Sequence, residues 1–184
     1  IFTPPLGLAY IAGSLRSAKF KVQMIDAVGE SLDTRHPSNN DCFIYGLSQE
    51  QTIDGIDPNT DIIGIALGFS FEWPTCRDLI NAVRARFPKA LLIGGGEHIT
   101  AVPTQSLEDS AIDIGVLGEG EETAVEIAIA VSENRLNPEE IAGIVFRNDL
   151  GQIHINERRP RKRDLDDIAL PAWDLMPIEN YLER

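Results

Sequence analysis

The sequence predicts an α/β fold built on a doubly wound parallel sheet. Over residues 61–134, apolar runs typical of buried strands alternate with amphipathic segments that repeat apolar side chains at helical spacing. The predicted strands are residues 61–68, 90–93 and 112–117, and the predicted helices are residues 74–87, 103–109 and 119–134. Strands joined through helices need crossover connections, which are right-handed, so we expect the three strands to run parallel.

The first sixty residues show a mixed pattern. Residues 6–18 repeat apolar side chains at helical spacing, after two prolines suited to a helix start. Residues 20–27 alternate apolar and polar side chains, which predicts a strand. Residues 28–60 are polar and too long for an ordinary connection, so we expect a functional loop or excursion there. Within this stretch, Ser48 is expected to cap a short helix.

The chain changes character near its C-terminal end. Residues 142–147 and 152–156 flank the turn sequence Asn148-Asp149-Leu150-Gly151, which predicts a β-hairpin. Residues 169–183 combine prolines and aromatic side chains, and we expect a linker that packs against another part of the protein. The predicted domain organisation is an α/β domain over residues 1–141, followed by a hairpin and connector over residues 142–184.

Composition and charge exclude several classes of function. The chain carries 16 basic and 29 acidic side chains, a formal charge of −13, which argues against a nucleic-acid-binding protein. No apolar run approaches the roughly 18–20 residues needed to span a bilayer. Cys42 and Cys76 form neither a disulfide framework nor a CxxC site, so we expect a reduced cytoplasmic protein. The chain lacks an initiator Met and a C-terminal stop signal, and we expect it to be part of a longer polypeptide.

Glycines follow all three predicted strands. The sequences are Gly68-Phe69-Ser70, Gly94-Gly95-Gly96-Glu97-His98 and Gly118-Glu119-Gly120. In an open parallel sheet, ligands bind beyond the carboxyl ends of the strands, where a residue without Cβ lets a ligand approach the backbone closely. One such loop alone is more often an ordinary turn, but three along one edge favour a ligand site.

The ligand is not an obvious nucleotide. Neither a GxGxxG sequence in the dinucleotide arrangement nor GxxxxGK[ST] is present, and the loop at residues 118–120 has acidic neighbours that would repel phosphate. Small residues and backbone amides suit a large, mostly uncharged ligand with a long tail.

Individual side chains give weaker signals. His98 lies beside the triple glycine and is a candidate functional residue. The alternative is that it is only a polar residue at a helix N-terminus. Glu119, Glu121 and Glu122 are interpreted as residues of a helix start rather than as catalytic acids, because no nucleophile or metal partner is near them in sequence. The remaining candidates are expected to be structural or solvated: His36, His154, Trp73, Trp173 and the basic run at residues 158–163. Ser70 lies outside a GxSxG elbow, which weakens a hydrolase interpretation.

The ordered set of these motifs resembles a known family. The segments PPLGLAYIAGSLR, DIIGIALGFS, LLIGGGEHIT and VLGEGEET occur in that order, followed by a connector with Leu165-Asp166-Asp167 and Pro171-Ala172-Trp173-Asp174. They resemble the N-terminal cobalamin (B12)-binding domain of B12-dependent radical S-adenosylmethionine (SAM) proteins. The resemblance covers the chain apart from residues 28–42, and it is unspecific for substrate.

The resemblance implies a fold and a cofactor site. The family fold is a five-stranded flavodoxin-like, Rossmann-like sheet, whose first strand would precede Pro4 and is absent here, so that the second and third strands would be exposed. Residues 94–96 would make room for the nucleotide tail of cobalamin, and Ser70 would bind the tail or an amide of the corrin ring. Glu97 and His98 would lie in a loop near the corrin. The full implied set is Leu6, Gly7, Gly68, Ser70, Gly94, Gly95, Gly96, Glu97, His98, Gly118, Glu119 and Gly120.

Two departures from wider B12 and radical SAM patterns limit what this chain is expected to do. The DxHxxG signature is absent, so no protein histidine is expected as the lower cobalt ligand. The CxxxCxxC sequence that would hold a [4Fe–4S] cluster is also absent, so this chain alone is not expected to cleave SAM or methylate a substrate.

The sequence therefore predicts a cobalamin-binding module of a radical SAM enzyme. The resemblance implies a radical SAM domain in the same longer polypeptide, with a [4Fe–4S] cluster and SAM, performing methyl transfer or a radical oxidation or cyclisation. No nucleic-acid or membrane partner is expected. One alternative is a degenerate B12-like domain that holds no cofactor and serves as a structural or docking module. Another is a flavodoxin-like electron carrier, although the phosphate loop expected after a first strand is missing.

Overall fold

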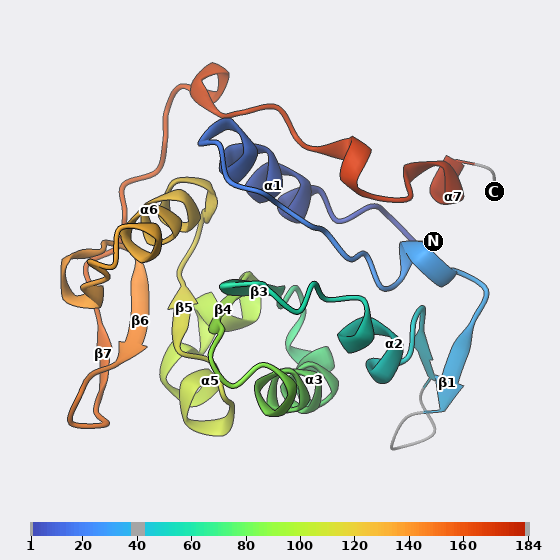
Figure 1. Ribbon diagram of the computed structural model, residues 1–184, viewed down its shortest axis with the longest axis horizontal. Helices are drawn as coiled ribbons and strands as arrows, with labels where there is room; N and C mark the ends of the chain where they lie inside the picture. Colours follow the sequence, from blue (N-terminus) through green and yellow to red (C-terminus); the bar gives the residue numbers. More distant parts are fainter. Residues whose placement is uncertain (1, 38–42, 183–184) are drawn as a thin grey trace. The chain divides into compact units, whose positions relative to one another are not determined.

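A computed structural model describes residues 2–37 and 43–182, and Cys42 lies outside these residues. The chain divides into two compact units (Figure 1). Unit 1 comprises Ile1–Asp57 together with Ala169–Arg184, and unit 2 comprises Pro58–Ile168. The predicted boundary after residue 141 between a B12-binding-like domain and a connector stays a prediction.

Unit 2 is built on a five-stranded sheet in the order β3-β4-β5-β6-β7. The strands are β3 (Ile62–Ala66), β4 (Leu91–Gly95), β5 (Ile114–Val116), β6 (Ile144–Arg147) and β7 (Ile153–Ile155). The first three are parallel, as predicted, and β6 and β7 form an antiparallel hairpin, also as predicted. The hairpin extends the same sheet, because β6 pairs with β5 in antiparallel register.

Helices cover both faces of this sheet (Figure 1). They are α3 (Trp73–Arg86), α4 (Glu97–Ala101), α5 (Pro103–Asp109) and α6 (Glu121–Ser132). On one face, Ile93 and Ile114 pack in a buried cluster with Ile127 of α6. On the other face, the backbone of Gly115 lies close to side chains of α4 and α5. This is the doubly wound α/β arrangement that the sequence predicted.

Unit 1 is assembled from short elements. They are α1 (Leu6–Ser17), η1 (Gly29–Ser31), β1 (Arg35–Pro37), β2 (Phe43–Tyr45), α2 (Gln49–Asp54), η5 (Trp173–Leu175) and α7 (Ile178–Leu182). The predicted cap of α2 is confirmed, because the Ser48 side chain accepts from the Gln51 backbone N–H and the Gln51 side chain accepts from that of Ser48.

The strand predicted over residues 20–27 is wrong. In the described chain this segment forms no β-ladder. Side chains make its contacts instead: Gln23 donates to the Gly55 carbonyl at 2.7 Å and accepts from the Asp57 N–H at 3.0 Å. The alternating pattern fixes which side chains share a face, but a strand also needs a neighbouring strand, and the pattern does not supply one.

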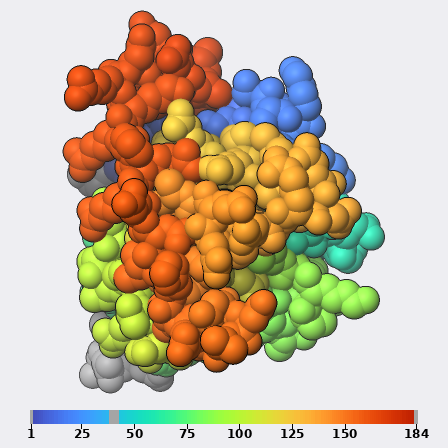
Figure 2. Space-filling model, turned by 90° about the vertical axis from the view of Figure 1, so that its left-hand side faces the viewer, coloured from blue at the N-terminus to red at the C-terminus, as the bar shows by residue number. Residues whose placement is uncertain are grey.

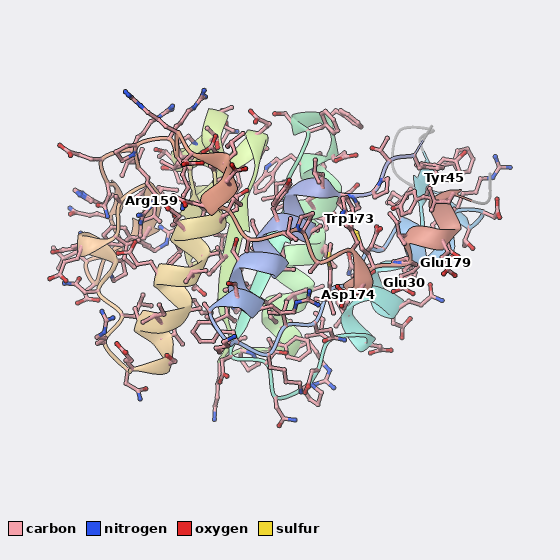
Figure 3. The ribbon with its side chains drawn as sticks, turned by 90° about the horizontal axis from the view of Figure 1, so that it is seen from above. Glu30, Tyr45, Arg159, Trp173, Asp174 and Glu179 are labelled. Carbon is pink, nitrogen blue, oxygen red and sulfur yellow. The ribbon has the colours of Figure 1, made fainter. Side chains whose placement is uncertain are left out.

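The C-terminal segment of unit 1 packs along α1, as expected, and its role as a linker stays a prediction (Figure 1). The Ala172 N–H donates to the Ala9 carbonyl at 2.9 Å, and Ala172 is fully buried. Arg16 forms an ion pair with Asp174, which is labelled together with Trp173 in Figure 3. The Tyr181 hydroxyl donates to the buried Asp26 carboxylate at 2.7 Å.

None of the helices among the described residues has the length and apolar character needed to cross a membrane.

Candidate functional site

The parallel register brings the carboxyl ends of three strands together in unit 2. Ala66 of β3 is the partner of Gly95 in β4, which in turn is the partner of Val116 in β5. The residues that follow these three positions therefore lie along one edge of the sheet. The structure gathers there most of the predicted site: Gly68, Ser70, Gly95, Gly96, Glu97, Gly118, Glu119 and Gly120.

Three glycines at this edge leave space that a side chain would fill. A Cβ at Gly68 or at Gly118 would meet no atom within 4 Å, and a Cβ at Gly95 would have only the Val116 Cβ near it, at 3.9 Å. Packing inside the protein therefore does not require glycine at these positions, although the φ of +77° at Gly118 favours glycine there. The space beside them is open, and its use as a ligand site stays a prediction.

The other two glycines of the triple sequence serve the protein itself. Gly94 is buried, and a Cβ there would lie 2.6 Å from Cδ1 of Ile112. Gly94 therefore faces the packed helices rather than the open edge, because successive residues of a strand point to opposite faces. Gly96 has a φ of +112° and lies against the Leu67 carbonyl, so it makes the turn that starts α4.

His98 does not lie in a loop, where the family resemblance placed it. It belongs to α4, and its side chain is only 6 % exposed. Its ring stacks on Trp73 with 4.4 Å between ring centroids, and its Nδ1 lies 3.0 Å from the hydroxyl oxygen of Ser70. Burial lowers the pKa of His98 from its ordinary value of 6.5, so the imidazole is neutral at pH 7.

Two nitrogens in this stack lack partners. Among the described residues, neither His98 Nε2 nor Trp73 Nε1 has a hydrogen-bond partner, and both atoms are buried. The prediction that Trp73 packs in the core is confirmed by its 8 % exposure. Unpartnered buried nitrogens are uncommon in proteins. The stack of His98 on Trp73 therefore places polar atoms inside the packed core.

The acidic residues at the edge are arranged as a helix start. Glu121 and Glu122 occupy the first turn of α6, where carboxylates stabilise the helix dipole, as predicted. Glu97 and Glu119 are exposed. The Gly118 N–H donates to the Thr100 hydroxyl at 2.9 Å, which holds the glycine loop against α4.

Residues that sequence reasoning did not assign to the site line a cavity beside it. This cavity has a volume of about 170 Å³ and is lined by the loop at Gly118 and the connector at residues 158–168. Figure 2 shows the connector, in darker orange, beside the lighter orange of α6. Arg159 donates to the buried Thr123 hydroxyl at 2.9 Å and pairs with Glu126. Lys162 pairs with Glu122 at 3.1 Å. In the sequence, the spacing of Arg159 and Lys162 within the basic run was the only indication that these two side chains act together. Only the fold places them against α6.

The remaining predicted residues belong to unit 1. Leu6 and Gly7 open α1, both are exposed, and a Cβ at Gly7 would meet no atom within 4 Å. Their part in a cofactor site stays a prediction.

The chemistry available at the edge is that of binding. It offers backbone amides, a hydroxyl and carboxylates. The nearby Cys76 thiol is protonated at neutral pH, because burial and the Glu72 carboxylate raise its pKa to about 11. Within residues 2–37 and 43–182, no three His, Cys, Asp or Glu side chains are placed to hold a metal ion.

Comparison with known proteins identifies the class. The model of the B12 binding domain family matches residues 2–128, more than half of the chain, and this chain belongs to that family. Solved structures of cobalamin-dependent and radical SAM enzymes match nearly all of this chain, which confirms its resemblance to B12-dependent radical SAM proteins.

Two curated relatives align over nearly the whole chain. Cytidylyl-2-hydroxyethylphosphonate methyltransferase of Streptomyces wedmorensis is 28% identical, over 98% of this chain and 38% of the relative. Anaerobic magnesium-protoporphyrin IX monomethyl ester cyclase of Synechocystis sp. is 30% identical, over 97% of this chain and 33% of the relative. This chain therefore spans about a third of the length of these relatives.

Solved structures share the fold. The cobalamin-dependent SAM radical enzyme OxsB, solved with aqua-cobalamin and SAM, matches all of this chain and 23% of its own at a TM-score of 0.78 and 17% identity. The radical SAM methyltransferase TsrM from Kitasatospora setae, solved with cobalamin and a [4Fe-4S] cluster, matches 92% of this chain and 29% of its own, at a TM-score of 0.68 and 19% identity. The flavodoxin-like sheet predicted from the sequence is confirmed.

Proposed function

We propose that this domain binds cobalamin at the carboxyl edge of β3, β4 and β5. One observation carries the proposal: Gly68, Gly95 and Gly118 leave unfilled space at three neighbouring strand ends in a chain of the B12-binding family. The residues fit the cofactor, because a large ligand with an uncharged, amide-bearing periphery needs room at the backbone more than it needs countercharges.

Polar groups of the edge complement an amide-rich ligand. The exposed Ser70 hydroxyl can donate to an amide carbonyl, and the exposed carboxylates of Glu97 and Glu119 can accept from amide N–H groups. Backbone N–H groups in the loops after β4 and β5 add further donors. Gly94 lies behind this surface and supports it through packing.

The cofactor, when bound, supplies a cobalt centre for methyl or electron transfer. The domain's own residues bind it, orient it and limit access of water to it. We further propose that the domain belongs to a longer radical SAM enzyme with a [4Fe–4S] cluster and SAM, located in the cytoplasm. The enzyme performs methyl transfer or a radical oxidation or cyclisation. The expectation that no histidine of this chain ligates cobalt stays a prediction.

The test is an anaerobic titration of the purified chain with hydroxocobalamin and methylcobalamin, followed by absorbance and calorimetry. We expect saturable one-to-one binding with a base-off spectrum. A folded sample that binds neither corrinoid would favour the degenerate docking module instead. A parallel titration with flavin mononucleotide separates the electron-carrier alternative, for which the flavin and not the corrinoid would bind.

A further inference from the structure

The Ser70–His98 pair joins an exposed group to a buried one. Ser70 is exposed on the turn that follows β3, whereas His98 is 94 % shielded from solvent, since its exposed fraction is 6 %. Their side chains meet at 3.0 Å between Oγ and Nδ1, although 28 positions separate them in sequence. The Ser70 hydroxyl therefore faces the space where a ligand would bind, and the imidazole of His98 lies behind it in the protein interior.

His98 is held both at its ring and at its backbone. Its ring stacks on Trp73 at an interplanar angle of 26°. Its backbone N–H donates to the Leu67 carbonyl at the end of β3, at 3.2 Å. Its backbone carbonyl accepts from the Val102 N–H at 3.0 Å, within the helical turn. A ring held in this way has little freedom to rotate, so the position of Nδ1 determines where the Ser70 hydroxyl lies.

Hydrogen-bond partners favour one tautomer. Nδ1 is the ring nitrogen with a partner, whereas Nε2 has none among the described residues. A hydrogen on Nε2 would bury a second unpaired N–H in a stack where the indole N–H of Trp73 is already unpaired. A hydrogen on Nδ1 leaves only a lone pair at Nε2, and it gives Ser70 Oγ a donor.

We propose that His98 is a positioning residue: its Nδ1–H donates to Ser70 Oγ and thereby directs the hydroxyl hydrogen of Ser70 toward an amide carbonyl of the bound corrinoid. This inference rests on the proposed function of the edge. His98 acts through Ser70 and does not itself contact the cofactor. The Trp73 stack keeps the imidazole plane in place.

The experiment measures hydroxocobalamin affinity by calorimetry in a set of variants. Ser70→Ala and His98→Leu are each expected to weaken binding about fivefold to tenfold, and the double variant no further, because the two residues act as one unit. His98→Asn is expected to stay within about twofold of the parent, since its amide lies where Nδ1 lies. His98→Gln, whose amide reaches the Nε2 position, is expected to resemble His98→Leu.

Matched controls remove equivalent groups elsewhere in unit 2. Ser106→Ala deletes a buried hydroxyl that donates to the Val102 carbonyl at the start of α5, and His154→Leu deletes an exposed imidazole on the hairpin. Both are expected to bind as the parent does. Thermal midpoints identify any variant that fails to fold, and ¹⁵N NMR of the parent imidazole reports the tautomer without relying on any variant.

Each outcome decides the inference. Parental affinity in His98→Leu, with weakened affinity in Ser70→Ala, overturns the positioning role and leaves the proposed function standing. Additive losses in the double variant overturn it too, as does an Nε2–H tautomer in the NMR spectrum. A folded parent that binds no corrinoid overturns the proposed function, and with it this inference.

Discussion

Two glycines of unit 1 and three strand-end glycines of unit 2 show opposite uses of this residue. In unit 1 it allows backbone to pack against backbone: a Cβ at Gly13 would lie 2.1 Å from the Leu170 carbonyl oxygen, and a Cβ at Gly46 would lie 2.2 Å from that of Ala27. At the strand ends of unit 2, Gly68, Gly95 and Gly118 have no such neighbours. The position of the absent side chain is thus filled by protein at Gly13 and Gly46, and it is empty at the three strand-end glycines.

This difference separates stability from binding. A side chain added to a filled position must displace backbone, and the fold loses stability. A side chain added at Gly68 or Gly95 displaces nothing in the protein, so its effect is expected on the ligand alone, whereas Gly118 has a φ of +77° that also favours glycine. Substitutions at the two kinds of glycine should therefore produce different kinds of loss.

The largest effect is expected for Gly13→Ala in α1. Because the new Cβ meets a backbone oxygen, the free energy of unfolding should fall by about 3 kcal/mol. Gly7→Ala in the same helix meets no atom within 4 Å and should raise it by about 0.5 kcal/mol. Urea denaturation followed by circular dichroism measures both. Parental stability in Gly13→Ala would mean that the C-terminal segment does not pack on α1.

The second effect is on binding. Gly95→Val should weaken corrinoid affinity at least tenfold, on the order of 1.4 kcal/mol, and change the free energy of unfolding by less than about 1 kcal/mol. Gly64→Val is the matched control, because Gly64 lies within β3 and also has no atom within 4 Å of its Cβ position. Calorimetry and denaturation together separate the two quantities. Equal affinity in Gly95→Val and the parent would remove Gly95 from the site.

A third, smaller effect is expected where unit 1 is held by a hydrogen bond. Tyr181→Phe removes the donor to Asp26 and should lower the free energy of unfolding by about 1 kcal/mol at pH 7. Burial, followed by the hydrogen bond and charge of Asp26, raises the Tyr181 pKa above its ordinary value of 10.0. The stability that this group contributes is therefore present below pH 10 and lost as the pH rises above it.

Alkaline denaturation tests this assignment. The advantage of the parent over Tyr181→Phe should shrink between pH 9 and pH 10.5. Tyr45→Phe, at an exposed tyrosine of β2, serves as the control. An advantage that stays constant with pH would show that Tyr181 is not held by Asp26.

The smallest effect is expected at His98. Burial lowers its pKa in the folded state, so the unfolded chain takes up a proton near pH 6.5 that the folded chain does not. Stability should therefore fall as the pH drops through this region. Unfolding of the parent at pH 7.5 and pH 5.5, compared with His98→Asn, isolates the contribution. An equal pH dependence in both proteins would contradict it.

Elements with local signals were predictable from the sequence. The helix at residues 103–109 was predicted at its observed bounds, because Pro103 marks its first turn. The cap at Ser48 was predicted for the same reason, since a hydroxyl and the residues after it decide a helix start. The three glycine-terminated strands were also predictable, because each apolar run and its glycine are contiguous in the chain.

Features that depend on distant partners were not predictable. Residues 20–27 alternate like a strand but pair with no strand among the residues that the structure describes. Gly94 and Gly95 look equivalent in the sequence, although the alternation of a strand turns one toward Ile112 and the other toward the open edge. The partnership of His98 with Ser70 requires the turns after β3 and β4 to be adjacent, which only the sheet register establishes.

The hairpin after α6 consists of two strands, and this even number decides on which side of the sheet the chain leaves it. The chain enters β6 beside the end of β5, where the Leu117 N–H donates to the Gly143 carbonyl, and two antiparallel strands bring it back to the same side. An odd number of strands would deliver residue 158 to the far side of the sheet, about 13 Å away for a strand of four residues. Arg159 and Lys162 would then be out of reach of α6. The even strand count is therefore as much a requirement of the cavity as the side chains that line it.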